Sequence, residues 1–158
     1  THETTRLCLR TIEEIYAGES FFDVGTGTGI LAIAAAKLQD ENQLSKSKIV
    51  GCDTDEDSIT IAKENVEINQ TEEIELYVGS ISEDTRKFDF VCANLTADVI
   101  VPLLPLLVEK AEKKLLLSGI LKEQEDWAAS ALRELRITNY ELRTDGEWIS
   151  ILVVSGEW

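Results

Sequence analysis

Asp23-Val24-Gly25-Thr26-Gly27-Thr28-Gly29 connects the short apolar run Phe21–Val24, whose last two residues it includes, to a long apolar run that begins at Ile30. This is the context of a strand, a turn and a helix, in which such a motif has meaning. The glycines allow a tight turn and the close approach of a ligand. The helix start offers unpaired N–H groups to a carboxylate or phosphate. We therefore predict a ligand site at Gly25, Gly27 and Gly29; the alternative is a turn that only links strand to helix.

The spacing of the glycines distinguishes between two classes of nucleotide-like cofactor. A dinucleotide fingerprint needs Gly or Ala where this chain has Ile30. The pattern here is GxGxG with an acid, Asp23, two residues ahead of it. That pattern is typical of enzymes that bind S-adenosylmethionine. We predict this cofactor, with Asp23 part of its site, and the sequence disfavours NAD-dependent oxidoreduction.

Polar residues also follow the next two strands. Asp53 ends the second strand, where an acid can accept both ribose hydroxyls of a bound nucleoside. Asp55 and Asp57 follow closely, so the alternative is that all three acids only begin the next helix. Ser80 occupies the position after the third strand where many such enzymes carry an adenine-binding acid, and we expect it to be a weaker partner there.

Asn94 ends the fourth strand, and central strand ends border the ligand crevice in doubly wound folds. The carbonyl oxygen of its amide can hold an amine. We predict that Asn94 and the backbone carbonyl of Leu95 orient the acceptor amine, as the catalytic residues, and that Asn94 also borders the cofactor. The alternative is an Asn that only shapes the turn. No dedicated Asp, Glu or His base is evident, since His2 is the only histidine.

Hydrophobic periodicity predicts strands that alternate with helices. Such alternation implies a parallel, doubly wound sheet, and a closing hairpin around Asp145-Gly146 adds one antiparallel strand. The predicted fold is α/β: a Rossmann-like class I methyltransferase with a seven-stranded, mostly parallel sheet. In the helix predicted over 123–135, the spacing of Trp127, Ala131 and Leu135 places them inward. Helices are expected over 4–16, from 30, and over 58–69, 97–110 and 123–135, and strands over 21–24, 49–52, 74–78, 88–93, 115–117, 137–143 and 148–154.

The composition limits the partners and the compartment. Fifteen basic residues against 30 acidic ones give a net charge of −15. This charge argues against direct nucleic-acid binding and favours a basic partner. The alternative is that the charge only keeps the protein soluble. Three cysteines without CxxC spacing suggest neither a metal site nor a redox pair, and they fit a reducing cytoplasm. The longest apolar stretch, 99–108, is too short to span a membrane.

Several motifs together cover nearly the whole chain. They are HETTRLCL (2–9), DVGTGTGILAIAAAKL (23–38), GCDTDEDSI (51–59), AKENVEIN (62–69), ANL (93–95), LSGIL (117–121) and EW (147–148). In this order they resemble the PrmA family of methyltransferases, which act on ribosomal protein eleven of the large subunit. The glycine loop is generic to methyltransferases, whereas HETT, ANL and SGIL combined are far more specific.

The resemblance implies that Thr5, Gly25, Asp53 and Asn94 line the cofactor site, with His2 and Thr4 beside it. It also implies methylation of lysine side chains and an N-terminal amine of a basic ribosomal protein. The loop after Leu38 is longer than is usual in the family. Family members carry an amino-terminal substrate-recognition domain, which we expect to be absent from a chain that starts at Thr1.

The expected organisation is therefore one catalytic domain over residues 1–158 of a cytoplasmic enzyme, and the sequence leaves its oligomeric state open. Two other functions also fit these residues. One is a methyltransferase for another protein, an RNA or a small molecule. The other is a non-catalytic module that binds the cofactor.

Overall fold

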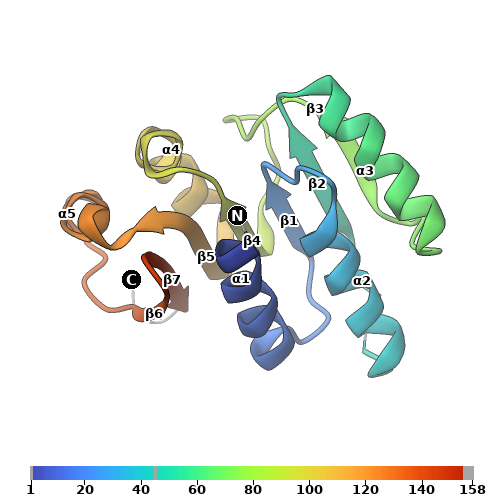
Figure 1. Ribbon diagram of the computed structural model, residues 1–158, viewed down its shortest axis with the longest axis horizontal. Helices are drawn as coiled ribbons and strands as arrows, with labels where there is room; N and C mark the ends of the chain where they lie inside the picture. Colours follow the sequence, from blue (N-terminus) through green and yellow to red (C-terminus); the bar gives the residue numbers. More distant parts are fainter. Residues whose placement is uncertain (1, 45, 155–158) are drawn as a thin grey trace.

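The computed structural model describes residues 2–44 and 46–154. The expected domain boundaries at 1 and 158 lie outside these ranges. The chain forms an alternation of helices and strands (Figure 1). In order, the elements are α1 (His2–Ile15), β1 (Phe21–Val24), α2 (Ile30–Glu41), β2 (Ile49–Asp53), α3 (Glu56–Ile68), β3 (Glu75–Val78), β4 (Phe88–Asn94), α4 (Ala97–Lys110), β5 (Ala111–Leu121), a 3₁₀ turn η1 (Lys122–Gln124), α5 (Glu125–Glu134), β6 (Glu141–Asp145) and β7 (Trp148–Val154).

The seven strands form one sheet in the order β3-β2-β1-β4-β5-β7-β6. Strands β1 to β5 pair in parallel, and β7 is antiparallel to both of its neighbours. The predicted seven-stranded sheet with one antiparallel strand is confirmed. The hairpin is tighter than expected, because Asp145 pairs with Trp148 and only Gly146 and Glu147 connect the two strands.

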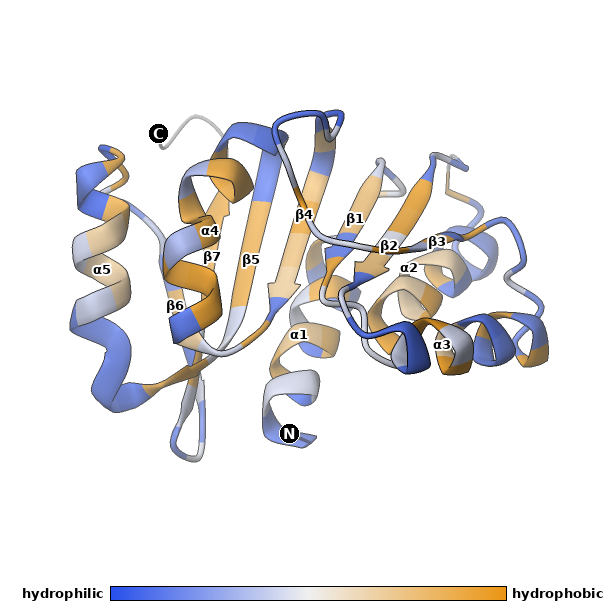
Figure 2. Ribbon diagram, turned by 90° about the horizontal axis from the view of Figure 1, so that it is seen from above, coloured by the Kyte–Doolittle hydropathy of each residue, from blue (hydrophilic) through white to orange (hydrophobic). Residues whose placement is uncertain are grey.

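Alternate side chains of each strand divide the core into two clusters. On one face, Phe22 and Val91 pack with buried residues of α4 and α5. On the other face, Phe21 and Phe90 pack with buried residues of α1, α2 and α3. Figure 2 shows the apolar strands between these two helical layers. Successive side chains of one strand therefore belong to different layers, which assigns the side chain of Asp23 to the layer of α1 and α2.

The direction in which successive strands are added to the sheet changes at β1, which lies between β2 and β4. From β1 the connections through α2 and α3 run outward one way, and from β4 the connection through α4 runs the other way. Right-handed crossovers place these two sets of helices on opposite faces. The two sets of loops separate above β1 and β4, so a crevice is expected at their carboxyl ends.

Three expectations about local structure were wrong. Strand β6 covers Glu141–Asp145 rather than 137–143. Strand β5 covers 11 residues rather than 115–117, because it pairs with β4 and β7 over polar residues at its start and through a bulge at its end. Trp127 is 46% exposed, not inward. Helix α5 instead buries Ala128, Ala129 and Leu132, since small alanines let the helix approach the sheet closely.

No helix within residues 2–44 and 46–154 has the length and apolar character needed to cross a bilayer. The same residues hold no group of three or more His, Cys, Asp or Glu side chains placed to bind a metal ion.

Candidate active site at the carboxyl ends of the central strands

The glycine loop between β1 and α2 needs left-handed backbone at three positions, with φ of +75° at Gly25, +56° at Gly27 and +87° at Gly29. A Cβ at Gly27 would meet no atom within 4 Å, so the space beside it is open to a ligand. A Cβ at Gly29 would lie 3.3 Å from Cβ of Ala62, and Gly29 is buried. Gly29 therefore allows α2 and α3 to pack closely, whereas the space beside Gly27 is open.

Asp53, the last residue of β2, is hydrogen-bonded to the glycine loop. Its Oδ2 accepts a hydrogen bond of 2.9 Å from the backbone N–H of Gly27, and its Oδ1 accepts one of 2.9 Å from Asp55. A carboxylate has about four acceptor positions, so each oxygen can accept a further donor such as a ribose hydroxyl. Asp55 is the N-cap of α3 and accepts from the backbone of Asp57. Of the three acids, Asp53 has the bond to the glycine loop, and the other two begin the helix.

Asp23 is almost completely buried behind the same loop, at 1% exposure. Its Oδ2 accepts a hydrogen bond of 2.7 Å from the hydroxyl of Thr26, and its Oδ1 has no partner of good geometry. Burial raises the pKa of Asp23 from 3.8 to about 7, the Thr26 hydrogen bond opposes this rise, and the negative charge of Asp53 adds to it. A buried carboxylate of this kind is stabilised by a cationic group of a ligand.

Asn94 and Leu95 form the turn that leaves β4, and this turn is tightly enclosed. The N–H of Leu95 donates to the carbonyl of Ser118 at 3.0 Å. A Cβ at Gly119 would collide with the carbonyl oxygen of Leu95, and a Cβ at Gly25 would collide with its side chain. Gly119 lies where the register of β5 against β7 shifts, so this bulge brings its backbone against the turn.

Beside this turn is a cavity of about 310 Å³. Three of the residues that line it were predicted from the sequence: Thr4, Asn94 and Leu95. Three others were missed, although two of them lie in the SGIL and EW motifs. The six lining residues are Thr4, Asn94, Leu95, Thr96, Gly119 and Trp148. None of the six side chains is ionisable, so the cavity walls provide no side chain that could act as a general base.

Three contacts position α1, which brings Thr4 to the cavity. Arg6 forms an ion pair of 2.9 Å with Asp145 at the β6–β7 turn, and Arg143 forms one of 2.7 Å with Glu14. The hydroxyl of Ser118 lies 3.4 Å from the carbonyl of Thr4, within hydrogen-bond range. The N-terminal end of α1 is thus held beside the strand that carries Trp148.

Besides Asp23, Asp53 and the three glycines, three further predicted residues lie outside the cavity lining. Thr5 is half-buried at the next position of α1, and His2 is exposed at its start. Ser80 is exposed and follows β3, which is separated from β1 by β2. Their predicted roles beside the cofactor stay predictions.

Residues 1–155 match the family model of ribosomal protein L11 methyltransferase (PrmA). The chain therefore belongs to the PrmA family. The L11 methyltransferase of Myxococcus xanthus is 38% identical over 153 residues, which are 95% of this chain and 51% of that protein. The one from Caldanaerobacter subterraneus subsp. tengcongensis is 38% identical over 157 residues, 97% of this chain and 48% of that protein.

Among solved structures, a ribosomal protein L11 methylase from Lactobacillus delbrueckii subsp. bulgaricus is 31% identical, with a TM-score of 0.84 over 96% of this chain and 78% of that one. The Rossmann-like class I methyltransferase fold is confirmed. The chain spans about half the length of the curated relatives that it matches.

Membership of this family confirms S-adenosylmethionine as the cofactor. The crevice fits this molecule in three respects. Asp53 has acceptor positions for ribose hydroxyls, and the open side of Gly27 leaves room for a ligand close to the backbone. The unpaired Oδ1 of Asp23 suits a cationic group, and the cofactor carries both an ammonium and a sulfonium.

Replacing Asp23 with Asn is expected to flatten the pH dependence of folding stability. Because its folded pKa is about 7 and its unfolded value 3.8, the folded protein holds a proton between these pH values that the unfolded chain releases. The resulting stabilisation is complete below about pH 4 and is lost as the pH rises through about 7, by a few kcal/mol at most. Urea unfolding at about pH 5 and about pH 8 measures the difference. The wild type should lose more stability between these conditions than Asp23→Asn, and equal losses would contradict the assignment.

Proposed function

We propose that this chain is the catalytic domain of a protein methyltransferase, which transfers methyl groups from S-adenosylmethionine to lysine side chains and the N-terminal amine of ribosomal protein L11. The cavity lined by Asn94 and Trp148 carries this proposal, because Leu95 in its lining packs against Gly25 of the glycine loop and its walls are uncharged. The names of the family and of its relatives supply the identity of the substrate.

The walls of this cavity favour a neutral amine over an ammonium ion. A free lysine has a pKa of about 10.4, so its deprotonation at pH 7 costs about 4.6 kcal/mol. Transfer into an uncharged, partly apolar cavity lowers that pKa, since desolvation penalises the charged form. The side-chain carbonyl of Asn94 and the backbone carbonyl of Leu95 can then each accept an N–H of the amine. This leaves the nitrogen lone pair free to attack.

Orientation is the main contribution that the protein has to make. The cofactor supplies a methyl group that its sulfonium already activates. Holding the amine in line with that group can contribute roughly 7–11 kcal/mol. Thr4, from α1, and Trp148, from β7, line the same cavity as Asn94, and the indole of Trp148 offers an aromatic surface for the aliphatic stem of a lysine. We infer that these two residues confine the side chain that Asn94 orients.

The charge of the chain is consistent with a basic substrate. A net charge of −15 attracts a basic ribosomal protein over a distance of about the Debye length, roughly 8 Å at physiological salt. The proposed compartment is the cytoplasm. Cys8, Cys52 and Cys92 are all free and buried, which fits a reducing environment.

Incubation with purified ribosomal protein L11 and methyl-labelled cofactor tests the function. Mass spectrometry should locate the added methyl groups on lysine side chains and on the N-terminal amine of L11. The assay should be run with this chain and with any longer protein of which it is a part. Transfer to RNA or to a small molecule, with none to L11 in either form, would overturn the proposal in favour of another methyltransferase. Cofactor binding without transfer to any acceptor would favour a non-catalytic module.

Asp53→Ala and Asn94→Ala should separate cofactor binding from amine orientation. Loss of the Asp53 carboxylate removes a charge-assisted contact worth roughly 1.5–3 kcal/mol, so cofactor affinity should fall by about tenfold to a hundredfold. Asn94→Ala should reduce kcat strongly and change cofactor affinity less. Calorimetry and steady-state kinetics measure the two effects, with Asn139→Ala, an exposed residue outside the cavity, as the matched control. Equal losses of affinity and kcat in Asn94→Ala would make Asn94 a cofactor residue only.

A further inference from the structure

The start of α1 and the β6–β7 turn lie next to each other at the edge of the sheet where the parallel strands end (Figure 2). Thr4 of α1 and Trp148 of β7 both line the proposed amine cavity. The guanidinium of Arg6 joins the two elements, because its Nε donates a hydrogen bond of 2.9 Å to Oδ2 of Asp145. The two residues of this ion pair therefore lie close in the chain to two residues of the cavity wall.

Pairing within the sheet places Asp145 directly beside Trp148. These two residues are opposite each other in β6 and β7, and Leu121 of β5 is opposite Trp148 on its other side. Side chains that are directly opposite project to the same face, with Cβ atoms roughly 4.5–5.5 Å apart. Leu152, an even number of residues along β7 from Trp148, packs in the core cluster that contains α1. The side chains of Asp145 and Trp148 are thus neighbours on the side of the sheet that α1 covers.

A second ion pair joins the same two elements at a distance from the cavity. Arg143 of β6 contacts Glu14 near the end of α1, with 2.7 Å between Nη2 and Oε2. Because an α-helix rises about 1.5 Å per residue, Glu14 lies about 15 Å from Thr4 along α1. This pair and the buried side chain of Leu7 hold the body of α1 on the sheet whether or not Arg6 is paired. The Arg6 ion pair therefore acts on the cavity end of α1 rather than on the attachment of the whole helix.

The ion pair of Arg6 and Asp145 is too exposed to contribute much to stability. The Arg6 side chain is 51% exposed and that of Asp145 is 18% exposed. Exposed pairs contribute little, because water screens the charges and two side chains lose freedom. The hydrogen bond from Arg6 holds the pKa of Asp145 below its ordinary value, and the positive charge of Arg10 acts in the same direction, so the pair is ionised at neutral pH. Breaking it should leave the chain folded but release the β6–β7 turn from the start of α1.

We propose that Arg6 and Asp145 are positioning residues for methyl transfer, whose ion pair fixes the separation of Thr4 from Trp148 and thus the width of the cavity that receives the acceptor amine. This inference rests on the proposed function, because it takes that cavity as the amine site. A displacement of about 1 Å in a reacting group can lower a rate about a hundredfold. Loss of the pair should therefore lower kcat, while the glycine loop and Asp53, which lie on other elements, still bind the cofactor.

A double-mutant cycle in kcat tests the pair, using this chain or a longer protein that contains it, whichever methylates L11. Arg6→Met keeps an aliphatic stem and removes the charge, and Asp145→Ala removes the carboxylate. Each should lower kcat about tenfold, and cofactor affinity measured by calorimetry should change less than about threefold. The double variant should be no slower than either single one, because the two residues act through one contact. Arg6→Lys, which can still pair with Asp145, should keep kcat within about threefold of the wild type.

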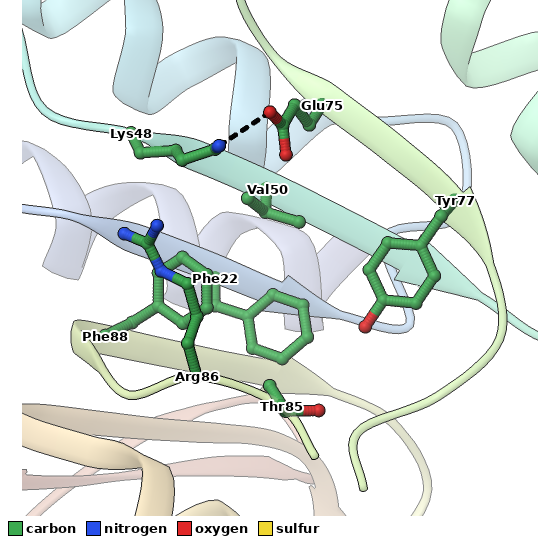
Figure 3. Close-up of a pocket in the computed structure, with 8 residues that line it drawn as sticks. All are labelled: Phe22, Lys48, Val50, Glu75, Tyr77, Thr85, Arg86 and Phe88. Atoms are coloured by element: carbon green, nitrogen blue, oxygen red, sulfur yellow. Dashed lines mark ion pairs between the residues drawn. The ribbon is translucent and has the colours of Figure 1, made fainter.

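The matched control is Lys48→Met, which also removes a paired positive charge and keeps an aliphatic stem. Lys48 forms an ion pair of 2.7 Å with Glu75, and its side chain is 41% exposed (Figure 3). This pair lies at the amino ends of β2 and β3, at the opposite edge of the sheet from the amine cavity. Lys48→Met should leave kcat within about twofold of the wild type. Equal losses of kcat in Lys48→Met and Arg6→Met would overturn the proposal, because the effect would then follow from the net charge.

Hydrogen exchange measured by mass spectrometry provides a readout that needs no acceptor. Backbone amides of residues 6–8 and 146–148 should exchange several-fold faster in Arg6→Met than in the wild type, and Lys48→Met should leave them unchanged. Unchanged exchange in Arg6→Met would overturn the proposal, as would additive losses of kcat in the cycle or a loss of cofactor affinity as large as the loss of kcat. A wild type that methylates no L11 would overturn the proposed function instead, and exchange at these amides would then decide the positioning role alone.

Discussion

The candidate site depends on a close approach of three backbone segments above β1, β4 and β5. The turn at Leu95 lies between Gly25 and Gly119, and neither glycine can carry a Cβ without a collision with it. The side chain of Leu95 fills the space beside Gly25, and its carbonyl oxygen lies against the bulge of β5. Because this packing is tight, the position of the Asn94 amide is coupled to that of the glycine loop. The glycine loop and the proposed amine cavity are therefore in direct contact through Leu95.

The electrostatics of the candidate site favour a cationic ligand. Two carboxylates, Asp23 and Asp53, lie at the ends of neighbouring strands in a chain that is already strongly acidic. Asp53 is stabilised by backbone N–H groups, whereas one oxygen of Asp23 is buried without a partner. That arrangement costs stability at neutral pH, since a buried carboxylate has to be ionised or protonated without full compensation. A ligand with a positive charge reduces this cost, so the same residue lowers the stability of the free protein and strengthens binding.

Local patterns in the sequence indicated the parts of the candidate site that belong to single connections. The glycine loop, Asp53 and Asn94 each follow a strand directly, and parallel strands bring such positions to one edge. Trp148 was missed because it begins β7, and its place beside β5 follows from pairing between strands that are far apart in the chain. Gly119 was not assigned a role because its constraint is a contact with Leu95, which no local pattern contains. The inward placement of Trp127 failed because α5 packs on alanines, whose size allows close packing that periodicity alone does not reveal.

A crystal structure of the domain with S-adenosylhomocysteine tests the central claim most directly. The account predicts that the ribose hydroxyls bind Asp53. The amino-acid portion of the ligand should lie along Gly25 and Gly27, with its ammonium group toward Asp23. The sulfur should face the cavity lined by Asn94 and Leu95. The account also predicts that Leu95 keeps its contacts with both glycines. A ligand bound away from this crevice, or a turn at Leu95 that moves away from Gly25 and Gly119 when the ligand binds, would contradict it.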